Sequence, residues 1–240
     1  MAWPWEIVER DHEIQNPTSA EKIRLLGAYL GLTSGSRVLD VACGKGGPAA
    51  ILAGTYRCRV LGIELRPAFA EEARRRAAAN RLESLIEVRT ADAADLRFEP
   101  DAWDAAICIG ASFVWGTIAD AASALRPWVR RGGYVAVGEP FWRQWPLPDT
   151  IEPENFVGLD ATVARLEQAG VATTGIIAAS DDDWDHYESL HWRAIEEWLA
   201  RDPVDTDAAQ VRAAHERFRS DYFRFKRALL GWAIFVGRKS

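Results

Sequence analysis

Short apolar segments alternate with longer segments of mixed polar and apolar residues from residue 37 onward. Five apolar segments predict β-strands, at residues 37–41, 59–64, 85–90, 103–109 and 133–138. The segments between and after them predict helices, at residues 46–55, 67–80, 119–129 and 157–169. Strands that alternate with helices are typical of an α/β fold, in which helices cover both faces of a mostly parallel sheet.

The pattern changes near the C-terminus. Two further apolar segments predict strands at 174–179 and 230–237, so the chain closes on a strand and indicates a final antiparallel hairpin. A hairpin needs only about 2–5 loop residues. Because about fifty residues separate these two strands, we predict a helical, aromatic-rich insertion at 181–228.

Composition and charge narrow the class of protein. Apolar residues make up 48% of the 240 residues, which is enough for a large core, and the net charge of −6 argues against a nucleic-acid partner. The N-terminal residues lack the basic start and apolar run of a secretory signal, and no segment has the ~20 apolar residues of a membrane span. Three widely spaced cysteines predict neither a disulfide framework nor a zinc motif. We therefore expect a cytoplasmic protein.

A glycine-rich turn joins the first predicted strand to the first helix, in the sequence V-L-D-V-A-C-G-K-G-G-P-A at residues 38–49. Gly44 and Gly46 allow a tight turn and a close approach to a ligand, and the following helix offers free N–H groups. The same glycines also satisfy the G-x-G-x-x-A pattern of dinucleotide-binding proteins, in which Glu64 would bind a ribose.

Three features favour a ligand other than a dinucleotide. Asp40 precedes the glycines, where its carboxylate would repel a pyrophosphate but accept hydrogen bonds from an ammonium group. Pro48 removes a donor from the first helical turn. The closing strand at 230–237 is not a requirement of a dinucleotide fold.

The segment D-x-A-C-G-x-G at 40–46 resembles the first motif of class I S-adenosylmethionine-dependent methyltransferases. The order of elements is also similar, over residues 37–180 and 229–238. The resemblance implies a Rossmann-like seven-stranded sheet of order 3-2-1-4-5-7-6 with an antiparallel C-terminal strand. It also implies S-adenosylmethionine as the cofactor.

The resemblance further implies a role for each matching residue. Asp40 would lie near the methionine amino group, and Glu64 would accept from both ribose hydroxyls. Leu65 would flank the adenine. Asp92, whose alternative role is to cap a helix, would meet the adenine amino group, with Ala93 beside it. The remaining cofactor residues would be Ala42, Cys43, Gly44 and Gly46 beneath the methionine portion, and Ile109 and Gly110 near the sulfonium.

Three further segments resemble a bacterial subgroup of this family, the YjhP-type methyltransferases. They are E-R-D-H-E-I-Q-N-P at 9–17, G-E-P-F-W-R-Q at 138–144 and D-W-D-H-Y-E-S-L-H-W-R at 183–193. We therefore expect three parts: a helical N-terminal arm at 1–36, a cofactor-binding core at 37–180 and 229–240, and an inserted lid at 181–228.

Eleven tryptophans are unusually many for a chain of this length. Several aromatic residues fall in segments that follow the carboxyl ends of strands, where open α/β sheets bind ligands. We predict that a small acceptor contacts Trp115, Phe141, Trp142, Trp184 and Tyr187. The alternative is that aromatic residues of the insertion form a hydrophobic core of its own. This alternative is favoured for Trp192 and Trp198.

A general base is needed only if the acceptor carries a proton. Glu139 is the first candidate and His12 the second, followed by His186 and His191, and each has the alternative of a structural polar role.

We predict no metal site, because the consecutive acids at 181–183 point in different directions and more naturally begin a helix. The predicted function is methyl transfer to an O, N or C atom of a small molecule. The alternatives are a cofactor-binding protein without transfer and a NAD-dependent oxidoreductase.

Overall fold

The computed structural model describes residues 5–151, 154–201 and 208–240. Its centre is one seven-stranded sheet of order β3-β2-β1-β4-β5-β7-β6. The strands are β1 (Arg37–Val41), β2 (Arg59–Glu64), β3 (Ile86–Thr90), β4 (Trp103–Ile109), β5 (Val129–Trp142), β6 (Val171–Ala178) and β7 (Leu230–Lys239). β7 pairs antiparallel with both β5 and β6, whereas the other pairs are parallel. The fold predicted from the sequence is confirmed.

Helices cover both faces of the sheet because successive strand residues point to opposite sides. Val38 belongs to one apolar cluster, with residues of α2 (Ala20–Tyr29) and α3 (Gly47–Tyr56). Leu39 belongs to the other, with residues of α5 (Ile118–Leu125) and α6 (Leu159–Gln168). The helix α4 (Pro67–Ala79) packs beside α3 and β3. The first cluster includes two fully buried residues of α2, Ile23 and Leu26, so α2 is a layer of the core.

Several elements differ in length from the sequence-based prediction, and two of these differences have a clear physical reason. The helix predicted at 119–129 ends at Leu125 and continues as a 3-10 turn, η2 (Arg126–Trp128), because Pro127 cannot extend an α-helix. β5 extends to Trp142, beyond the predicted end at residue 138, and pairs there with the first half of β7. This extension places residues 139–142 inside the sheet rather than in a loop.

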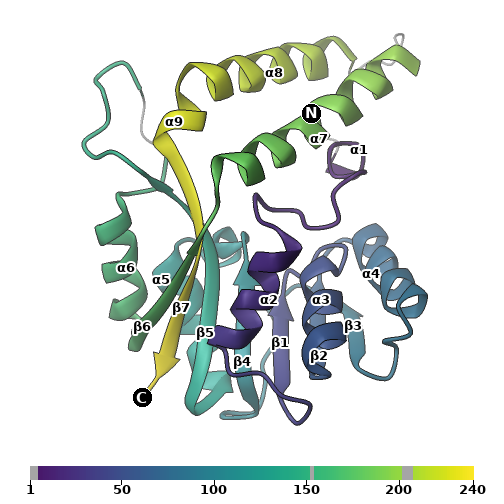
Figure 1. Cartoon of the computed structure of the whole chain (residues 1–240), viewed down its shortest axis with the longest axis vertical. Coiled ribbons are helices and arrows are strands. Elements are labelled where there is room, and N and C mark those ends of the chain that lie inside the picture. The colour runs from purple at the N-terminus through teal and green to yellow at the C-terminus, as the bar shows by residue number, and fades with distance from the viewer. Residues whose placement is uncertain (1–4, 152–153, 202–207) are drawn as a thin grey trace.

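The insertion forms α7 (Asp181–Arg201), α8 (Ala208–Asp221), the π-helical turn η3 (Tyr222–Lys226) and α9 (Arg227–Leu229). In Figure 1, α7 and α8 lie across one end of the sheet, and α1 (Trp5–Val8) lies beside α7. A small apolar cluster of Val8, Ile195, Leu199, Ala208 and Val211 joins these helices. Trp198 packs against this cluster and Trp192 against the main core, so the core role predicted for both is confirmed.

The acids at 181–183 begin α7, as predicted. Ser180 and Asp183 exchange hydrogen bonds between side chain and backbone, which satisfies N–H groups of the first turn. Asp183 also pairs with Lys22, which joins the insertion to α2. Within the ranges described, no helix combines the length and the apolar character needed to cross a membrane.

Candidate functional site

A cavity of about 370 Å³ opens at the carboxyl ends of the parallel strands, a size typical of small-molecule sites. Eight of the predicted cofactor residues line it: Ala42, Gly44, Glu64, Leu65, Asp92, Ala93, Ile109 and Gly110. Asp40 and Cys43 line a smaller cavity that shares Ala42, Gly44 and Ile109 with the first. The structure therefore brings these ten residues to one place.

The glycine-rich turn has left-handed backbone conformations at Gly44 (φ 54°) and Gly46 (φ 75°). A Cβ atom on Gly46 would lie 2.8 Å from the Cβ of Ala73 on α4, so this glycine permits the turn to pack against that helix. A Cβ atom on Gly44 would lie 2.1 Å from Oε1 of Gln15. Both positions require glycine for conformation and for space.

The N-terminal segment packs directly on this turn. Gln15 accepts a hydrogen bond from the backbone N–H of Lys45 (2.8 Å), and Asn16 donates one to the carbonyl of Ile109 (2.8 Å). The buried ammonium group of Lys45 donates to the carbonyls of Glu9, Arg10 and His12 at 2.9–3.0 Å. No role was predicted from the sequence for Lys45, Gln15 or Asn16, although Gln15 and Asn16 belong to the E-R-D-H-E-I-Q-N-P segment. These bonds fix the segment as one wall of the cavity.

Asp40 is buried at the end of β1, and its Oδ2 atom has no hydrogen-bond partner among the described residues. Burial, and secondarily the charge of Glu64, raise the pKa of Asp40 to about 8. An unpartnered buried carboxylate oxygen is costly unless a donor approaches it. A cationic ammonium group in the adjoining cavity would supply that donor.

Glu64 ends β2 and lines the same cavity. Its Oε2 atom accepts from the N–H of Gly44 (2.9 Å), and its Oε1 atom accepts from the N–H of Arg66 (2.8 Å). These bonds hold the carboxylate in one orientation. Each carboxylate oxygen has a second lone pair, so the group can still accept from two neighbouring hydroxyls.

Two large apolar side chains are exposed where they line the cavity, Leu65 at 62% and Phe113 at 76%. Exposed apolar surface at a cavity indicates a place for an apolar or flat ligand group. Asp92 lies nearby and accepts from the N–H of Ala94 (2.9 Å), so it shapes the turn after β3 as well as lining the cavity. The residues present fit an adenine and a ribose in the main cavity and an ammonium group in the smaller cavity that adjoins it.

The three cysteines are buried and free. Burial raises the pKa of the Cys43 thiol well above its usual value, so the thiol stays protonated near neutrality. The packing role predicted for Cys43 fits this environment, because the thiolate rather than the thiol is the nucleophile.

The predicted acceptor residues divide into two groups. Tyr187 lines the main cavity and also a second one of about 230 Å³ between the insertion helices and α1, and Trp5 lines both as well. The other four lie outside the lining described for these two cavities. Trp115 is half-buried against the α5 side of the sheet, Phe141 belongs to that same cluster, and Trp142 and Trp184 belong to the opposite one. The structure thus brings one of the five predicted residues to the cavities.

The two leading candidate bases also lie behind the cavity wall. Glu139 is buried on β5 and accepts a hydrogen bond from Ser112, in the 3-10 turn η1 (Ser112–Val114) whose Phe113 and Val114 line the cavity. Burial raises the pKa of Glu139 above its usual range. His12 is buried against Tyr187, and burial lowers the pKa of its imidazole. The general-base role stays a prediction for both, whereas His186 is exposed on α7.

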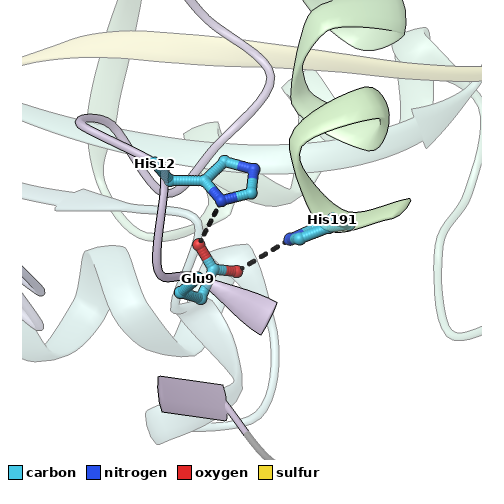
Figure 2. A group of neighbouring side chains, drawn as sticks. All are labelled: Glu9, His12 and His191. Atoms are coloured by element: carbon cyan, nitrogen blue, oxygen red, sulfur yellow. Dashed lines mark hydrogen bonds and ion pairs between the residues drawn. The ribbon is translucent and has the colours of Figure 1, made fainter. Parts of the chain in front are cut away.

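One titratable residue of the cavity lining was missed by the sequence analysis. Glu9 follows α1, is buried, and lines the main cavity. It lies between His12 and His191, which Figure 2 shows pointing toward it. No local pattern signals this group, because Glu9 and His191 are 182 positions apart.

The sheet order, the glycine turn and the acids that end β1 and β2 together define a class I S-adenosylmethionine-dependent methyltransferase. The family described as "Methyltransferase domain" matches residues 38–133. The crystal structure of a SAM-dependent methyltransferase from Thiobacillus denitrificans, in complex with S-adenosyl-L-homocysteine, is similar to the chain with a TM-score of 0.92 and 32% identity. The similarity covers all of both chains.

Two curated relatives narrow the relationship. YjhP of Escherichia coli (strain K12) is 30% identical over 237 residues, which cover 96% of this chain and 95% of that protein. The 27-O-demethylrifamycin SV methyltransferase of Amycolatopsis mediterranei (strain S699) is 28% identical over 229 residues, covering 89% and 81%. The chain belongs to the YjhP family of S-adenosylmethionine-dependent methyltransferases.

Proposed function

We propose that this enzyme methylates a small organic molecule that enters from the cavity between the insertion and α1. The observation that carries the proposal is the shared wall: Trp5 and Tyr187 line both that cavity and the cofactor cavity. An acceptor on the insertion side of this wall would therefore adjoin the cofactor cavity. The buried, free cysteines support a reducing location, and we place the reaction in the cytoplasm.

For the cofactor, we propose that Asp40 binds the methionine ammonium group and Glu64 the two ribose hydroxyls. Leu65, Asp92 and Ala93 hold the adenine. Five residues surround the methionine and sulfonium portion: Ala42, Cys43, Gly44, Ile109 and Gly110. Their place in the two connected cavities supports these roles. Gly46 acts indirectly, by packing the turn against α4.

S-adenosylmethionine supplies an electrophilic methyl group on a sulfonium. The protein's residues have two tasks, to orient the acceptor and to exclude water. The apolar side chains of Ile63, Phe69 and Val114 line the cavity and suit the second task. Tyr187 of the insertion suits the first, because aromatic faces bind flat or cationic groups.

The proposed acceptor atom is an oxygen, a nitrogen or a carbon. A hydroxyl oxygen is the first acceptor to test. The relative from Amycolatopsis mediterranei carries 27-O-demethylrifamycin SV in its name, which specifies an oxygen acceptor for that protein. A hydroxyl must lose its proton on methylation, so a base near the shared wall would be needed. Glu139 and His12 stay the candidates for this base, although neither lines the cofactor cavity.

We predict that cofactor binding depends on pH through Asp40. Its carboxyl has a pKa near 8 in the free protein and is therefore mostly protonated at pH 6–7. A bound ammonium group favours the carboxylate, so binding releases a proton and the affinity for S-adenosylhomocysteine rises with pH. We expect a gain of up to about tenfold per pH unit from pH 6 to 7.5, measured by calorimetry.

The matched variant is Asp40→Asn, which cannot ionise. It should bind S-adenosylhomocysteine at least about tenfold more weakly at pH 7.5, with an affinity that no longer changes with pH. An unchanged pH dependence in this variant would show that another group titrates.

The function is tested by transfer of a radiolabelled methyl group from S-adenosylmethionine to a bacterial metabolite extract. We expect label in the fraction below about 1,000 daltons, in a range typical of small ligands. Tyr187→Ala should lower the rate at least about tenfold while binding S-adenosylhomocysteine normally. Phe223→Ala removes an exposed aromatic of the insertion and should leave the rate unchanged. Label confined to macromolecules would contradict the proposal, and cofactor binding without any transfer would favour a non-catalytic protein.

A further inference from the structure

Glu9, His12 and His191 form a compact group of three metal-binding side chains at the junction of the N-terminal segment and α7 (Figure 2). One ligand atom from each residue lies within 4.8 Å of the others. Glu9 and His12 are fully buried, and His191 is 14% exposed. The group adjoins the cofactor cavity, because Glu9 and the neighbouring Tyr187 line it.

The hydrogen bonds of His12 leave a lone pair directed into this group. Its Nε2 atom lies 2.9 Å from the carbonyl oxygen of Tyr187, and a carbonyl only accepts, so Nε2 carries the proton. In the neutral ring Nδ1 is then a bare acceptor. Nδ1 lies 3.4 Å from Oε2 of Glu9, and neither atom has a hydrogen-bond partner among the residues described. Two buried acceptors that face each other need a positive charge between them, and either a proton on Nδ1 or a metal ion supplies it.

His191 has the complementary arrangement. Its Nε2 atom faces Oε1 of Glu9 at 3.0 Å, and its Nδ1 atom faces Oε2 of Glu188 at 3.9 Å. A histidine that ligates a metal usually has its outer nitrogen directed at a carboxylate or a carbonyl, which fixes the ring. Both histidines of this group have such an outer partner, Tyr187 for His12 and Glu188 for His191.

We propose that Glu9, His12 and His191 bind one divalent transition-metal ion of the zinc class, with a free coordination position toward the cofactor cavity. Two imidazoles and a carboxylate suit zinc, cobalt or nickel rather than magnesium, which prefers oxygen ligands. Three protein ligands leave the fourth position of a tetrahedral ion for another molecule. An oxygen of the acceptor fits that position, and this part of the inference rests on the proposed function.

The distances suit an ion of this size. Zinc lies about 2.0–2.2 Å from nitrogen and oxygen ligands, so two ligand atoms of a tetrahedral site are about 3.4 Å apart. The separation of 3.4 Å between Nδ1 of His12 and Oε2 of Glu9 matches this value. The widest separation, 4.8 Å, must shorten by about 1.4 Å, which side-chain rotation supplies. The sequence-based expectation of no metal site did not include this group, because His191 is 182 positions from Glu9 in the chain.

The experiment is a titration of the EDTA-treated full-length protein with zinc chloride, with S-adenosylhomocysteine binding measured on the same samples. We expect one zinc per chain, and at least about 100-fold weaker binding in both His191→Ala and Glu9→Gln. His186→Ala removes an exposed histidine from the same helix and should bind zinc as the wild type does. Cobalt chloride added to the wild type should give visible d–d bands that zinc removes.

Each outcome decides the proposal. Absence of stoichiometric zinc binding in the wild type would overturn it, and so would binding that survives both His191→Ala and Glu9→Gln. In either case Glu9 and His191 form an ion pair without a metal. Binding of S-adenosylhomocysteine in the same samples separates this failure from a failure of the proposed function, because Asp40 and Glu64 require no metal. A magnesium chloride titration that matched the zinc result would also contradict the proposed ligand chemistry.

Discussion

Replacing Glu64 with glutamine is expected to weaken the binding of S-adenosylhomocysteine about 100-fold, or about 2.7 kcal/mol. Hydrogen bonds to a charged group contribute about 1.5–3 kcal/mol each, and this carboxylate is positioned to accept from two ribose hydroxyls. Glutamine keeps only one acceptor oxygen. It also loses one of the bonds that Glu64 accepts from the N–H groups of Gly44 and Arg66, so the glycine turn is held less firmly. Calorimetric titration at constant pH measures the change.

Glu87→Gln is the control for this experiment. Glu87 lies on the adjacent strand β3, where its exposed side chain pairs with Arg89. Its replacement removes the same charge from the protein and should leave the affinity within about twofold, because a surface ion pair contributes little. Similar losses in the two variants would mean that net charge, and not a contact of Glu64, determines binding.

The second large effect is expected on stability. Trp142→Ala should lower the free energy of unfolding by about 3–5 kcal/mol, the usual cost of removing a large aromatic side chain from a core. Trp142 is 1% exposed and packs in the cluster on the α2 side of the sheet. Urea denaturation followed by circular dichroism measures the change, and the affinity for S-adenosylhomocysteine of the folded variant should stay within about threefold.

Trp145→Ala provides the matched control, because Trp145 is three residues away and 53% exposed. Its replacement should cost less than about 1 kcal/mol, as exposed substitutions usually do. The prediction is wrong if Trp142→Ala unfolds like the wild type and loses only acceptor turnover. That outcome would restore the acceptor-binding role that the sequence suggested for Trp142.

The cofactor side of this enzyme could be predicted because its information is local in the chain. Asp40, the glycines and Glu64 lie at the ends of two strands whose apolar patterns are plain, and parallel strands bring their carboxyl ends to one edge. Every predicted strand is present, and the predicted sheet order is the observed one. The order of the strands in the sheet was predicted from the resemblance to a known family. The positions of the strands and helices were predicted from the pattern of apolar segments.

The residues that contact the acceptor could not be predicted as well as those that contact the cofactor, and β5 shows one reason. The segment E-P-F-W was expected to form a loop, but β7 returns alongside it and extends the strand. Alternate residues of a strand point to opposite faces, so Phe141 and Trp142 enter the two core clusters instead of a ligand site. Pairing with a strand about ninety residues later leaves no local signal in the sequence.

The insertion shows a second reason. Its aromatic residues could be counted, but which of them face a cavity depends on how α7 packs against the N-terminal segment. Tyr187 and Trp5 meet at the shared wall only in the folded chain. The same packing brings Glu9 to His191, so both the acceptor wall and the proposed metal site are products of long-range contacts.

We propose that the cavity beside Asp40 and Glu64 binds S-adenosylmethionine rather than a dinucleotide. The most direct test is a pair of calorimetric titrations of the wild-type protein at pH 7.5, one with S-adenosylhomocysteine and one with NAD. We predict binding of one S-adenosylhomocysteine per chain with a dissociation constant of about 1–100 μM, and no measurable heat from NAD at the same concentrations. Binding of NAD as tight as that of S-adenosylhomocysteine, or the absence of S-adenosylhomocysteine binding, would contradict the account.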